Sequence, residues 1–292
     1  MKIPGKEISE VLELYLKDKV NKLREKKIVP HLVTILIGES AEQISYVTKK
    51  KQVAEKLGIK FDFVHLRDTP SFEKFIQTIK IYANDPQVNG IIIQQPLPPQ
   101  LQTDSIYNFI PANKEIEGHR AKSVFHPPIS LATLTIFKYI YLQQNLDSSI
   151  LIDINSDMPL IKKSLKHKKI VMIGKGITGG RPIGKTFNLF KINFISVNSQ
   201  TLNPSEYYQK ADIIITAVGK KILTKNFIKA GAVLINIGLR RENDKLKGDY
   251  DESEIKDIAS FYTSTPGGVG PIDVLYLYCN LIMATELQNG IQ

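Results

Sequence analysis

The fold is decided by the stretch KKIVMIGKGITGGRPIGKTF, which occupies residues 168–187. A short apolar strand runs into the pattern Gly-x-Gly-x-x-Gly at residues 174–179, and Pro182 marks the expected start of a helix. The first two glycines permit a tight turn and a close backbone approach to a pyrophosphate, while the helix N-terminus offers free N–H groups. Because the strand before the turn and the helix after it are both present, the stretch predicts a dinucleotide-binding unit.

The next strand helps to choose the cofactor. In NAD-binding folds this strand ends in Asp or Glu, which holds the ribose 2′-hydroxyl and repels a 2′-phosphate. Here the strand NFISVNSQT, residues 193–201, carries no acid, and Lys175 lies inside the glycine turn, where it can face a phosphate. The sequence therefore favours NADP, with NAD as the alternative.

Outward from this stretch, strands and helices alternate along most of the chain. Strands are expected at residues 31–38, 60–66, 88–93, 168–174, 193–199, 211–219, 232–238 and 260–264. Helices are expected around residues 8–16, 41–57, 72–82, 130–144 and 272–287, with an uncertain polar region through Asp157. Such alternation predicts an α/β fold with parallel sheets covered by helices on both faces.

Length and composition agree with a folded protein of about two domains. The chain has 292 residues, of which 42% are hydrophobic and 23% are charged, and its single cysteine is Cys279. One cysteine allows no internal disulfide, which favours a reducing compartment. The absence of a long apolar stretch and of a secretion-type N-terminus predicts a cytoplasmic protein that does not enter a membrane.

The charge balance leaves two interpretations open. Lys and Arg number 39 against 29 Asp and Glu, which gives a formal net charge of +10. A basic protein can bind nucleic acid, but no Lys/Arg run interleaved with aromatic residues and no nucleic-acid-binding motif is present. We therefore expect small anionic ligands rather than nucleic acid.

In the expected helix at residues 41–57, one lysine shares a face with apolar residues. Tyr46, Lys50, Val53 and Leu57 follow each other at helical spacing, whereas the neighbouring lysines lie on other faces. Partial burial disfavours the charged form of a lysine and suits it to acid–base chemistry. A lysine that extends into solvent from an ordinary helix gives the same spacing.

Two loops have the composition of ligand-binding segments. Gln94 ends an apolar strand just before Gln95-Pro-Leu-Pro-Pro, at the edge where α/β sheets bind ligands. The segment TPGGVGP, residues 265–271, exposes backbone groups on a rigid loop that is poor in side chains. Either segment by itself is also consistent with a tight turn.

Four motifs carry a family resemblance when they are taken together. Tyr-Val-x-x-Lys appears at residues 46–50 with Gly-Ile at 58–59, and Gln-Leu-Pro-Leu-Pro appears as Gln-Gln-Pro-Leu-Pro at 94–98. Gly-Arg-Ser-x-x-Val-Gly-x-Pro appears as Gly-Lys-Gly-Ile-Thr-Gly-Gly-Arg-Pro at 174–182, and Pro-Gly-Gly-Val-Gly-Pro is intact at 266–271. In this order, over nearly the whole chain, the motifs resemble the bifunctional methylenetetrahydrofolate dehydrogenase/methenyltetrahydrofolate cyclohydrolase family of the FolD type.

The resemblance implies an architecture, an activity and a set of partners. A folate-binding domain of residues 1–145 and 272–292, with the C-terminal helix packing back on it, would accompany a Rossmann-type NADP-binding domain of residues 146–271. The enzyme would oxidise 5,10-methylenetetrahydrofolate with NADP and hydrolyse the methenyl product to 10-formyltetrahydrofolate. The family also suggests a homodimer, a role in purine biosynthesis and no metal.

The resemblance also implies site residues. Lys50 would be the acid–base group, Tyr46 would stack on the folate and Gln94 would hold the lysine. The implied substrate-binding residues are Tyr46, Lys50, Ile93, Gln94, Gln95, Glu117, Pro266, Gly267, Gly268, Val269, Gly270 and Asp273. The implied cofactor-binding residues are Gly174, Lys175, Gly176, Gly179, Gly180, Ser199 and Leu239.

The chain departs from the family pattern at several of these positions. The usual Asp-Val-Asp-Gly becomes Glu-Ile-Glu-Gly at residues 115–118, so the pterin-contacting acid, Glu117, is one methylene longer. Lys175 and Gly176 replace Arg and Ser in the cofactor turn, and Asp273 stands in place of Thr after the glycine loop. Two alternatives follow, namely a member with only one of the two activities, and a Rossmann dehydrogenase that acts on another small acid.

Overall fold

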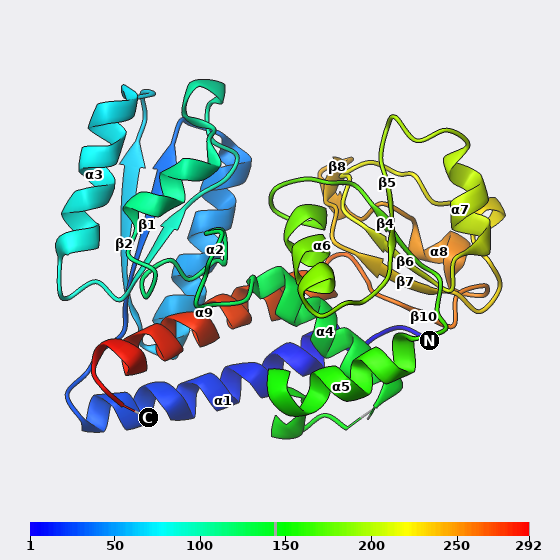
Figure 1. Cartoon of the computed structure of the whole chain (residues 1–292), viewed down its shortest axis with the longest axis horizontal. Helices are drawn as coiled ribbons and strands as arrows, with labels where there is room; N and C mark the ends of the chain where they lie inside the picture. Colours follow the sequence, from blue (N-terminus) through cyan, green and yellow to red (C-terminus); the bar gives the residue numbers. More distant parts are fainter. Residues whose placement is uncertain (143–144, 292) are drawn as a thin grey trace. The chain divides into compact units, whose positions relative to one another are not determined.

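The computed structural model describes residues 1–142 and 145–291 and divides the chain into two compact units (Figure 1). The three-stranded unit comprises Glu13–Pro128 and Val274–Gln292, and the five-stranded unit comprises Met1–Leu12 and Ile129–Asp273. Two helices, α1 (Gly5–Glu25) and α9 (Val269–Gln288), contribute residues to both units. Within the described residues, none of the helices is long and apolar enough to cross a membrane.

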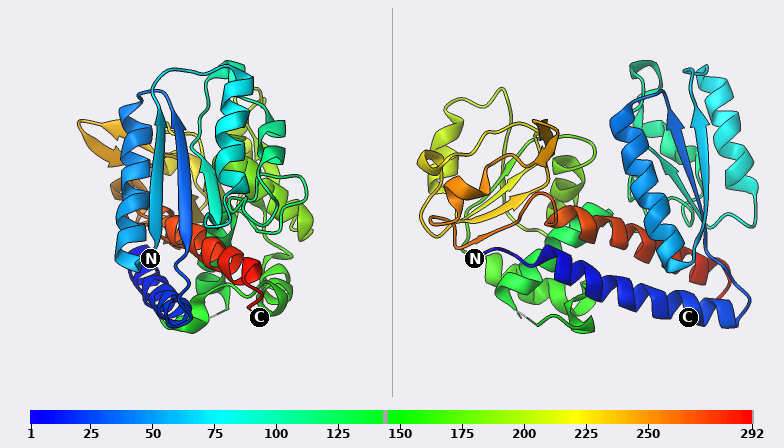
Figure 2. Two further views of the ribbon diagram at one scale, coloured as in Figure 1. Left: turned by 90° about the vertical axis from the view of Figure 1, so that its left-hand side faces the viewer. Right: turned by 180° about the vertical axis from the view of Figure 1, so that it is seen from behind.

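The three-stranded unit is built on a parallel sheet of order β2-β1-β3. Its strands are β1 (His31–Ile37), β2 (Lys60–Leu66) and β3 (Gly90–Ile93), and every residue of the central strand β1 is buried. Helices α2 (Ala41–Leu57) and α3 (Phe72–Asn84) lie on opposite faces of this sheet (Figures 1 and 2). The strands and helices expected from the sequence in this region are confirmed.

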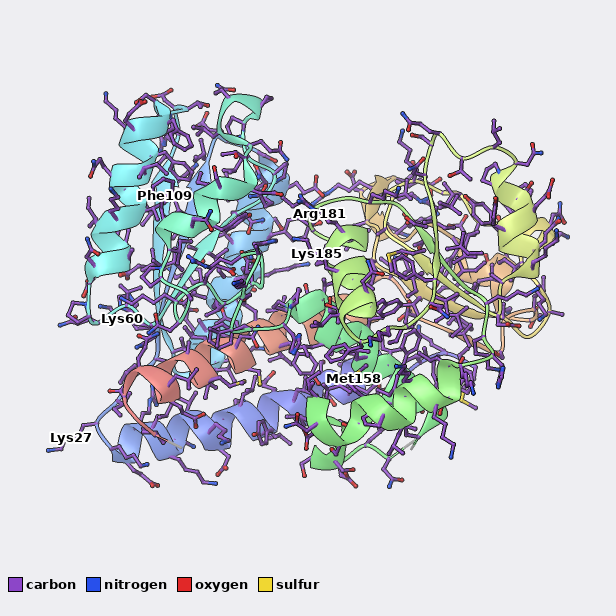
Figure 3. The ribbon with its side chains drawn as sticks, in the orientation of Figure 1. Lys27, Lys60, Phe109, Met158, Arg181 and Lys185 are labelled. Carbon is purple, nitrogen blue, oxygen red and sulfur yellow. The ribbon has the colours of Figure 1, made fainter. Side chains whose placement is uncertain are left out.

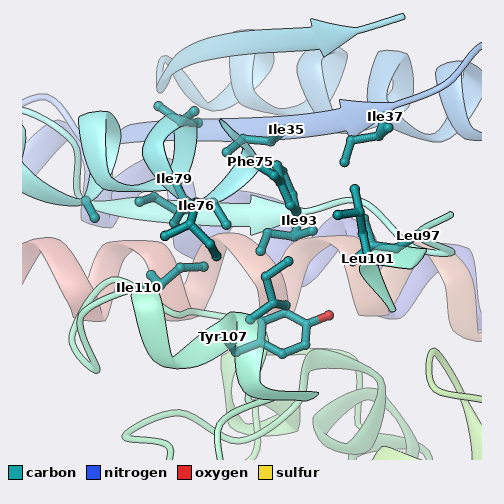
Figure 4. Close-up of a cluster of buried hydrophobic side chains, with 14 of the residues drawn as sticks. Ile35, Ile37, Phe75, Ile76, Ile79, Ile93, Leu97, Leu101, Tyr107 and Ile110 are labelled. Carbon is teal, nitrogen blue, oxygen red and sulfur yellow. The ribbon is translucent and has the colours of Figure 1, made fainter. Parts of the chain in front are cut away.

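The core of this unit lies between the sheet and α3, as Figure 4 shows. Phe75, Ile76 and Ile79 of α3 pack against Ile35 of β1 and Ile93 of β3, and all five side chains are buried. The spacing of the α3 residues is that of one helix face, and the strand residues alternate with those that face α2. Each fully buried side chain of this kind contributes roughly 1.5–3 kcal/mol, so this layer holds α3 firmly against β1 and β3.

The five-stranded unit contains a parallel sheet of order β10-β7-β6-β4-β5. The strands are β4 (Ile170–Ile173), β5 (Ile195–Val197), β6 (Ile213–Thr216), β7 (Val233–Asn236) and β10 (Phe261–Tyr262). Helix α6 (Gly180–Leu189) covers one face, and α7 (Pro204–Lys210) and α8 (Glu252–Ile255) cover the other (Figures 1 and 2). This doubly wound sheet confirms the Rossmann-type prediction.

Several elements differ from the sequence expectation. Helix α9 begins at Val269, because the end of the glycine loop already forms its first turn, and α6 begins at Gly180 rather than at Pro182. Helix α4 spans Pro128–Tyr141, and residues 143–144 of the expected helix lie outside the described residues. No helix was expected at α5 (Ile154–Leu165), α7 or α8. The hairpin of β8 (Arg240–Glu242) and β9 (Lys245–Lys247) and the 3-10 turns Pro99–Leu101, Asp104–Phe109, Ser148–Ile150 and Lys225–Phe227 also had no sequence expectation.

A buried ion pair holds α5 against α4. Lys138 donates from Nζ to Oδ2 of Asp157 at 2.6 Å and to the carbonyl oxygen of Leu151 at 2.9 Å. The same carboxylate oxygen accepts the N–H of Asp153 at 2.8 Å, and both charged side chains are about one-tenth exposed. If α5 moved away from α4, each charge would be left without its partner in a place that water hardly reaches. The pair therefore holds α5 in position against α4.

We expect Asp157→Ala to lower the free energy of unfolding by about 3–5 kcal/mol, because it leaves the Lys138 ammonium buried and unpaired. The matched control is Asp18→Ala, which removes an Asp–Lys pair whose two side chains are more than half exposed. Urea unfolding should separate the two variants clearly. Equal midpoints for Asp157→Ala and Asp18→Ala would contradict this account of the pair.

Candidate active site

The lysine singled out by helical spacing is held at the end of β3. Lys50 lies on α2, which begins at the N-cap Ser40 and ends at Gly58, whose left-handed φ of 74° closes the helix. Its Nζ donates to Oε1 of Gln94 at 3.0 Å, and its side chain is 14% exposed. The hydroxyl of Tyr278 on α9 donates to the backbone carbonyl of Lys50 at 2.5 Å. Lys50 is therefore fixed both by its backbone and by its ammonium group.

Two consecutive glutamines leave β3 in different directions. Gln94 directs Oε1 to Lys50 and donates from Nε2 to the carbonyl of Gln95 at 2.9 Å. Gln95 donates from Nε2 to the hydroxyl of Tyr107 at 2.8 Å and accepts the N–H of Leu97 at 3.2 Å. Both glutamine side chains are buried, and the peptide bond from Gln95 to Pro96 is cis. The segment 94–98 is thus an ordered loop whose polar side chains are hydrogen-bonded at the carboxyl end of β3.

A carboxylate faces the lysine. Oε1 of Glu117 lies 3.8 Å from Nζ of Lys50, and Oε2 lies 3.8 Å from Nε2 of His119. Burial raises the pKa of Glu117, and the Lys50 ammonium opposes this rise. The backbone at this point is held by the neighbouring Glu115, whose buried carboxylate accepts three backbone N–H groups, those of Glu117, His119 and Arg120.

Other residues expected in the folate site occupy less direct positions. Tyr46 lies one helical turn before Lys50, and its hydroxyl donates to Glu42 at 3.2 Å. Ile93 is buried in the hydrophobic core, so that only its backbone can reach a ligand. Of the expected residues, the three-stranded unit thus brings Gln94 and Glu117 to Lys50, with Gln95 in the adjoining layer.

In the five-stranded unit, the glycine turn follows β4 directly. Gly174 has a φ of 99°, and a Cβ there would meet the carbonyl oxygen of Ala217 at 2.5 Å. A Cβ at Gly180 would overlap the carbonyl oxygen of Gly174, whereas a Cβ at Gly176 would have open space around it. The turn therefore packs tightly on the inside and leaves a cradle on the outside, which fits the approach of a pyrophosphate to the N-terminus of α6.

The remaining cofactor candidates surround the same sheet edge. Lys175 and Ser199 are exposed, and the N–H of Gly174 donates to the carbonyl of Val197 at the end of β5. The carbonyl oxygen of Leu239 would lie 2.9 Å from a Cβ at Gly219, which places the turns after β6 and β7 side by side. On α6, Arg181 and Lys185 project one turn apart (Figure 3).

The Pro266–Gly270 segment is anchored in the five-stranded unit. Oγ1 of Thr265 accepts Nδ2 of Asn236 at 2.8 Å, and the peptide bond from Thr265 to Pro266 is cis. The carbonyl oxygens of Gly267 and Gly268 lie so close to Gly5 that a Cβ there would meet both at 2.5 Å. Asp273 lies further along α9, at the last position of this unit.

The sequence analysis missed the buried polar group that supports these turns. The carboxylate of Asp249 accepts the N–H groups of Val218, Gly219 and Lys220 at 2.9, 2.8 and 3.1 Å, and burial raises its pKa. Asn236 accepts the N–H of Asp249 at 2.7 Å. Asn236 ends the apolar strand β7, but Asp249 lies in the polar segment 240–254, so no local sequence signal marks their pairing. Among the described residues, no group of three or more His, Cys, Asp and Glu side chains could hold a metal ion.

The two units define a class of protein. One is a doubly wound sheet with a phosphate-accepting glycine turn, and the other holds a mostly buried lysine beside a carboxylate at a strand end. This combination is that of an NAD(P)-dependent enzyme with a separate acid–base centre.

Comparisons with known proteins identify the family. Residues 3–117 match the model of the tetrahydrofolate dehydrogenase/cyclohydrolase catalytic domain, and residues 157–289 match that of the family's NAD(P)-binding domain. The bifunctional protein FolD of Staphylococcus aureus is 33% identical over 99% of this chain and 98% of its own length. The chain belongs to the tetrahydrofolate dehydrogenase/cyclohydrolase family. It is an NAD(P)-dependent methylenetetrahydrofolate dehydrogenase and methenyltetrahydrofolate cyclohydrolase of one-carbon metabolism.

Solved structures share the whole fold. The bifunctional FolD enzyme of Campylobacter jejuni superposes with a TM-score of 0.85 at 26% identity, covering 98% of this chain and 99% of that one. The FolD of Trypanosoma brucei, solved with NADP and an inhibitor, gives a TM-score of 0.83 at 21% identity, covering 98% and 97%. At that identity the second comparison supports the fold only.

The glycine turn yields a paired prediction. Gly176→Ala should leave thermal stability unchanged but weaken NADP about tenfold or more, because its methyl group enters the open cradle. Gly180→Ala should lower the free energy of unfolding by about 1–3 kcal/mol, because its methyl group meets backbone. Thermal unfolding and NADP fluorescence titration measure both effects. Unchanged NADP affinity in Gly176→Ala would show that the cradle is not the pyrophosphate site.

Proposed function

We propose that Lys50 is the acid–base group of the cyclohydrolase step and that Gln94 and Glu117 position it. The observation that carries this proposal is the hydrogen bond from the mostly buried Lys50 to Gln94 at the carboxyl end of β3. The Lys50 amine would accept one proton from the water that attacks the methenyl carbon and return it to the ring nitrogen as the bond between that carbon and the nitrogen breaks. The remaining hydroxyl proton would leave to solvent as the formyl C=O forms. The Oε1 atom of Gln94 keeps Nζ aimed at the site throughout the proton transfers.

The other site residues have binding roles in this proposal. Glu117 accepts hydrogen bonds from the pterin, and Tyr46 stacks on the substrate from α2. Ile93 and Gln95 contribute their backbone. Substrate-binding roles are also proposed, from the family resemblance alone, for Pro266, Gly267, Gly268, Val269, Gly270 and Asp273. The domain that carries the folate site is proposed to comprise residues 1–145 and 272–292, with residues 146–271 as the cofactor domain.

The proposed cofactor is NADP. Gly174, Gly176, Gly179 and Gly180 would form the turn that receives the pyrophosphate. Lys175 and Ser199 would hold the 2′-phosphate, and Leu239 would be a further cofactor-binding residue. When bound, NADP accepts the hydride that leaves the methylene carbon of the substrate. The absence of an acid after β5 and the exposed Lys175 support NADP over NAD. Parallel titrations with NADP and NAD test this choice, and tighter binding of NAD would refute it.

We also propose that the enzyme acts in the cytoplasm as a homodimer and supplies formyl groups for purine biosynthesis. The cytoplasmic location is supported by the single cysteine, which allows no internal disulfide and so fits a reducing compartment. The dimer is supported by the family resemblance. Sedimentation equilibrium should give twice the chain mass of 32.9 kDa. A monomer over the micromolar range would refute the dimer without affecting the assigned chemistry.

The catalytic assignment predicts that Lys50→Met lowers cyclohydrolase kcat by at least about 10²-fold, because it removes the acid–base group. Binding of NADP should remain within twofold of the wild type. The matched control is Lys49→Met, since Lys49 is the exposed neighbour on the same helix. The consumption of methenyltetrahydrofolate and the reduction of NADP are measured separately on each variant.

Two outcomes would contradict these roles. If the wild-type protein opens methenyltetrahydrofolate no faster than buffer does, the protein is a dehydrogenase alone. If Lys50→Met instead loses NADP binding and unfolds at lower temperature, Lys50 is a structural residue.

A further inference from the structure

A ring of linked polar side chains includes Lys50, Gln94 and Glu117 of the proposed folate site, and two of its members have no part in the function proposed above. They are Tyr107, in the 3-10 turn Asp104–Phe109, and His119, which follows the Glu-Ile-Glu-Gly segment. Their rings stack with centroids 4.5 Å apart and an interplanar angle of 26°. All the residues of the ring belong to the three-stranded unit.

The ring has two arms that start from adjacent residues at the end of β3. One arm is the hydrogen bond between Gln94 and Lys50 at 3.0 Å. The other runs from Gln95 to the Tyr107 hydroxyl at 2.8 Å, through the stacked rings to His119, and on to Oε2 of Glu117 at 3.8 Å. The arms meet where Oε1 of Glu117 faces Lys50, also at 3.8 Å. Glu117 is thus flanked by a basic nitrogen on each oxygen.

Burial makes this arm rigid. Tyr107 is 2% exposed, and its hydroxyl is fixed by the buried Gln95 amide. Burial also raises the pKa of Tyr107 far above its usual value, so the ring stays a neutral phenol at physiological pH. The stacked His119 is 15% exposed, and its backbone N–H is held by Glu115 at 3.0 Å. His119 therefore presents its Nε2 to Glu117 from a fixed position.

The chemistry of Glu117 explains why such a partner is needed. A glutamate has one more rotatable bond than the aspartate usual in the family, so its carboxylate must be held to act as a directed acceptor. Both flanking nitrogens lie 3.8 Å from the carboxylate oxygens, beyond direct hydrogen-bond distance. They therefore act on the carboxylate through electrostatic attraction and leave its lone pairs available to a ligand. Lys50 alone would fix only one of the two oxygens.

We infer that His119, held by Tyr107, is a positioning residue for Glu117 and, through it, for the substrate's pterin. This inference rests on the proposed function, because it assigns Glu117 the pterin contact. Pairing a longer acid with a stacked histidine compensates for the extra methylene, so the site keeps a directed carboxylate. His119 itself does not touch the reacting atoms in this assignment.

The test compares three variants that separate the nitrogen from the stack. His119→Phe keeps a ring against Tyr107 but removes the nitrogen that faces Glu117, and His119→Gln restores a nitrogen at the equivalent position. We expect His119→Phe to raise the dissociation constant of tetrahydrofolate about five- to tenfold, with NADP affinity unchanged, and His119→Gln to recover most of this loss. His167→Phe, at an exposed histidine of the other unit, is the matched control.

A double-mutant cycle with Glu117→Gln distinguishes positioning from a merely structural role. If His119 acts through Glu117, His119→Phe should have little further effect on tetrahydrofolate binding once Glu117 is already Gln. The inference would be overturned if His119→Phe weakened tetrahydrofolate binding by the same factor with and without Glu117→Gln. An unchanged tetrahydrofolate affinity in His119→Phe would also overturn it. A lowered melting temperature shared by His119→Phe and His119→Gln would do the same.

The readouts keep this inference separate from the proposed function. If the wild-type protein shows no cyclohydrolase activity, the function assigned to Lys50 is contradicted. The cycle in tetrahydrofolate affinity does not depend on turnover, so it still supports or overturns the role of His119.

Discussion

The proposed acid–base site of the three-stranded unit depends on the hydrogen bond from Lys50 to Gln94. This bond joins α2 to the end of β3, and both elements are held by buried apolar side chains, Val47, Ala54 and Leu57 on α2 and the core cluster around Ile91 and Ile93 on β3. A hydrogen bond to a charged group contributes roughly 1.5–3 kcal/mol, far less than the apolar core that positions it. The site is therefore imposed by packing, and the polar contacts select among side-chain conformations.

In the five-stranded unit, too, packing positions the strands and a few polar contacts order the turns that follow them. There the turn after β6 carries three backbone N–H groups, those of Val218, Gly219 and Lys220, which find their partner outside the sheet. Asp249 supplies that partner for the turn after β6, and Asn236 links Asp249 to Thr265 before the glycine loop. Because buried backbone groups must be hydrogen-bonded, one carboxylate can order several ligand-facing turns together.

In both units, individual charged groups at the proposed sites matter more than the net charge of +10. Around Glu117 the balance is between a buried carboxylate and the basic groups of Lys50 and His119. Around the glycine turn it is a helix N-terminus and an exposed Lys175 that can meet a phosphate. These features depend on a few placed groups, whereas most of the excess lysines are exposed on helices and turns.

The sequence by itself determined the alternation of strands and helices, the glycine turn after β4, and the face of α2 that carries Lys50. These are local features, since a helix face or a tight turn is specified by residues within a few positions of each other. The helix α5, the β8–β9 hairpin, the first turn of α9 and the partners of Gln95, Glu117 and Asp249 were decided only by the tertiary structure. Gln95 reaches Tyr107 and Asn236 reaches Asp249 across 12 and 13 residues. Such pairings form because burial leaves each polar group with few partners, and sequence spacing does not encode which partner packing brings within reach.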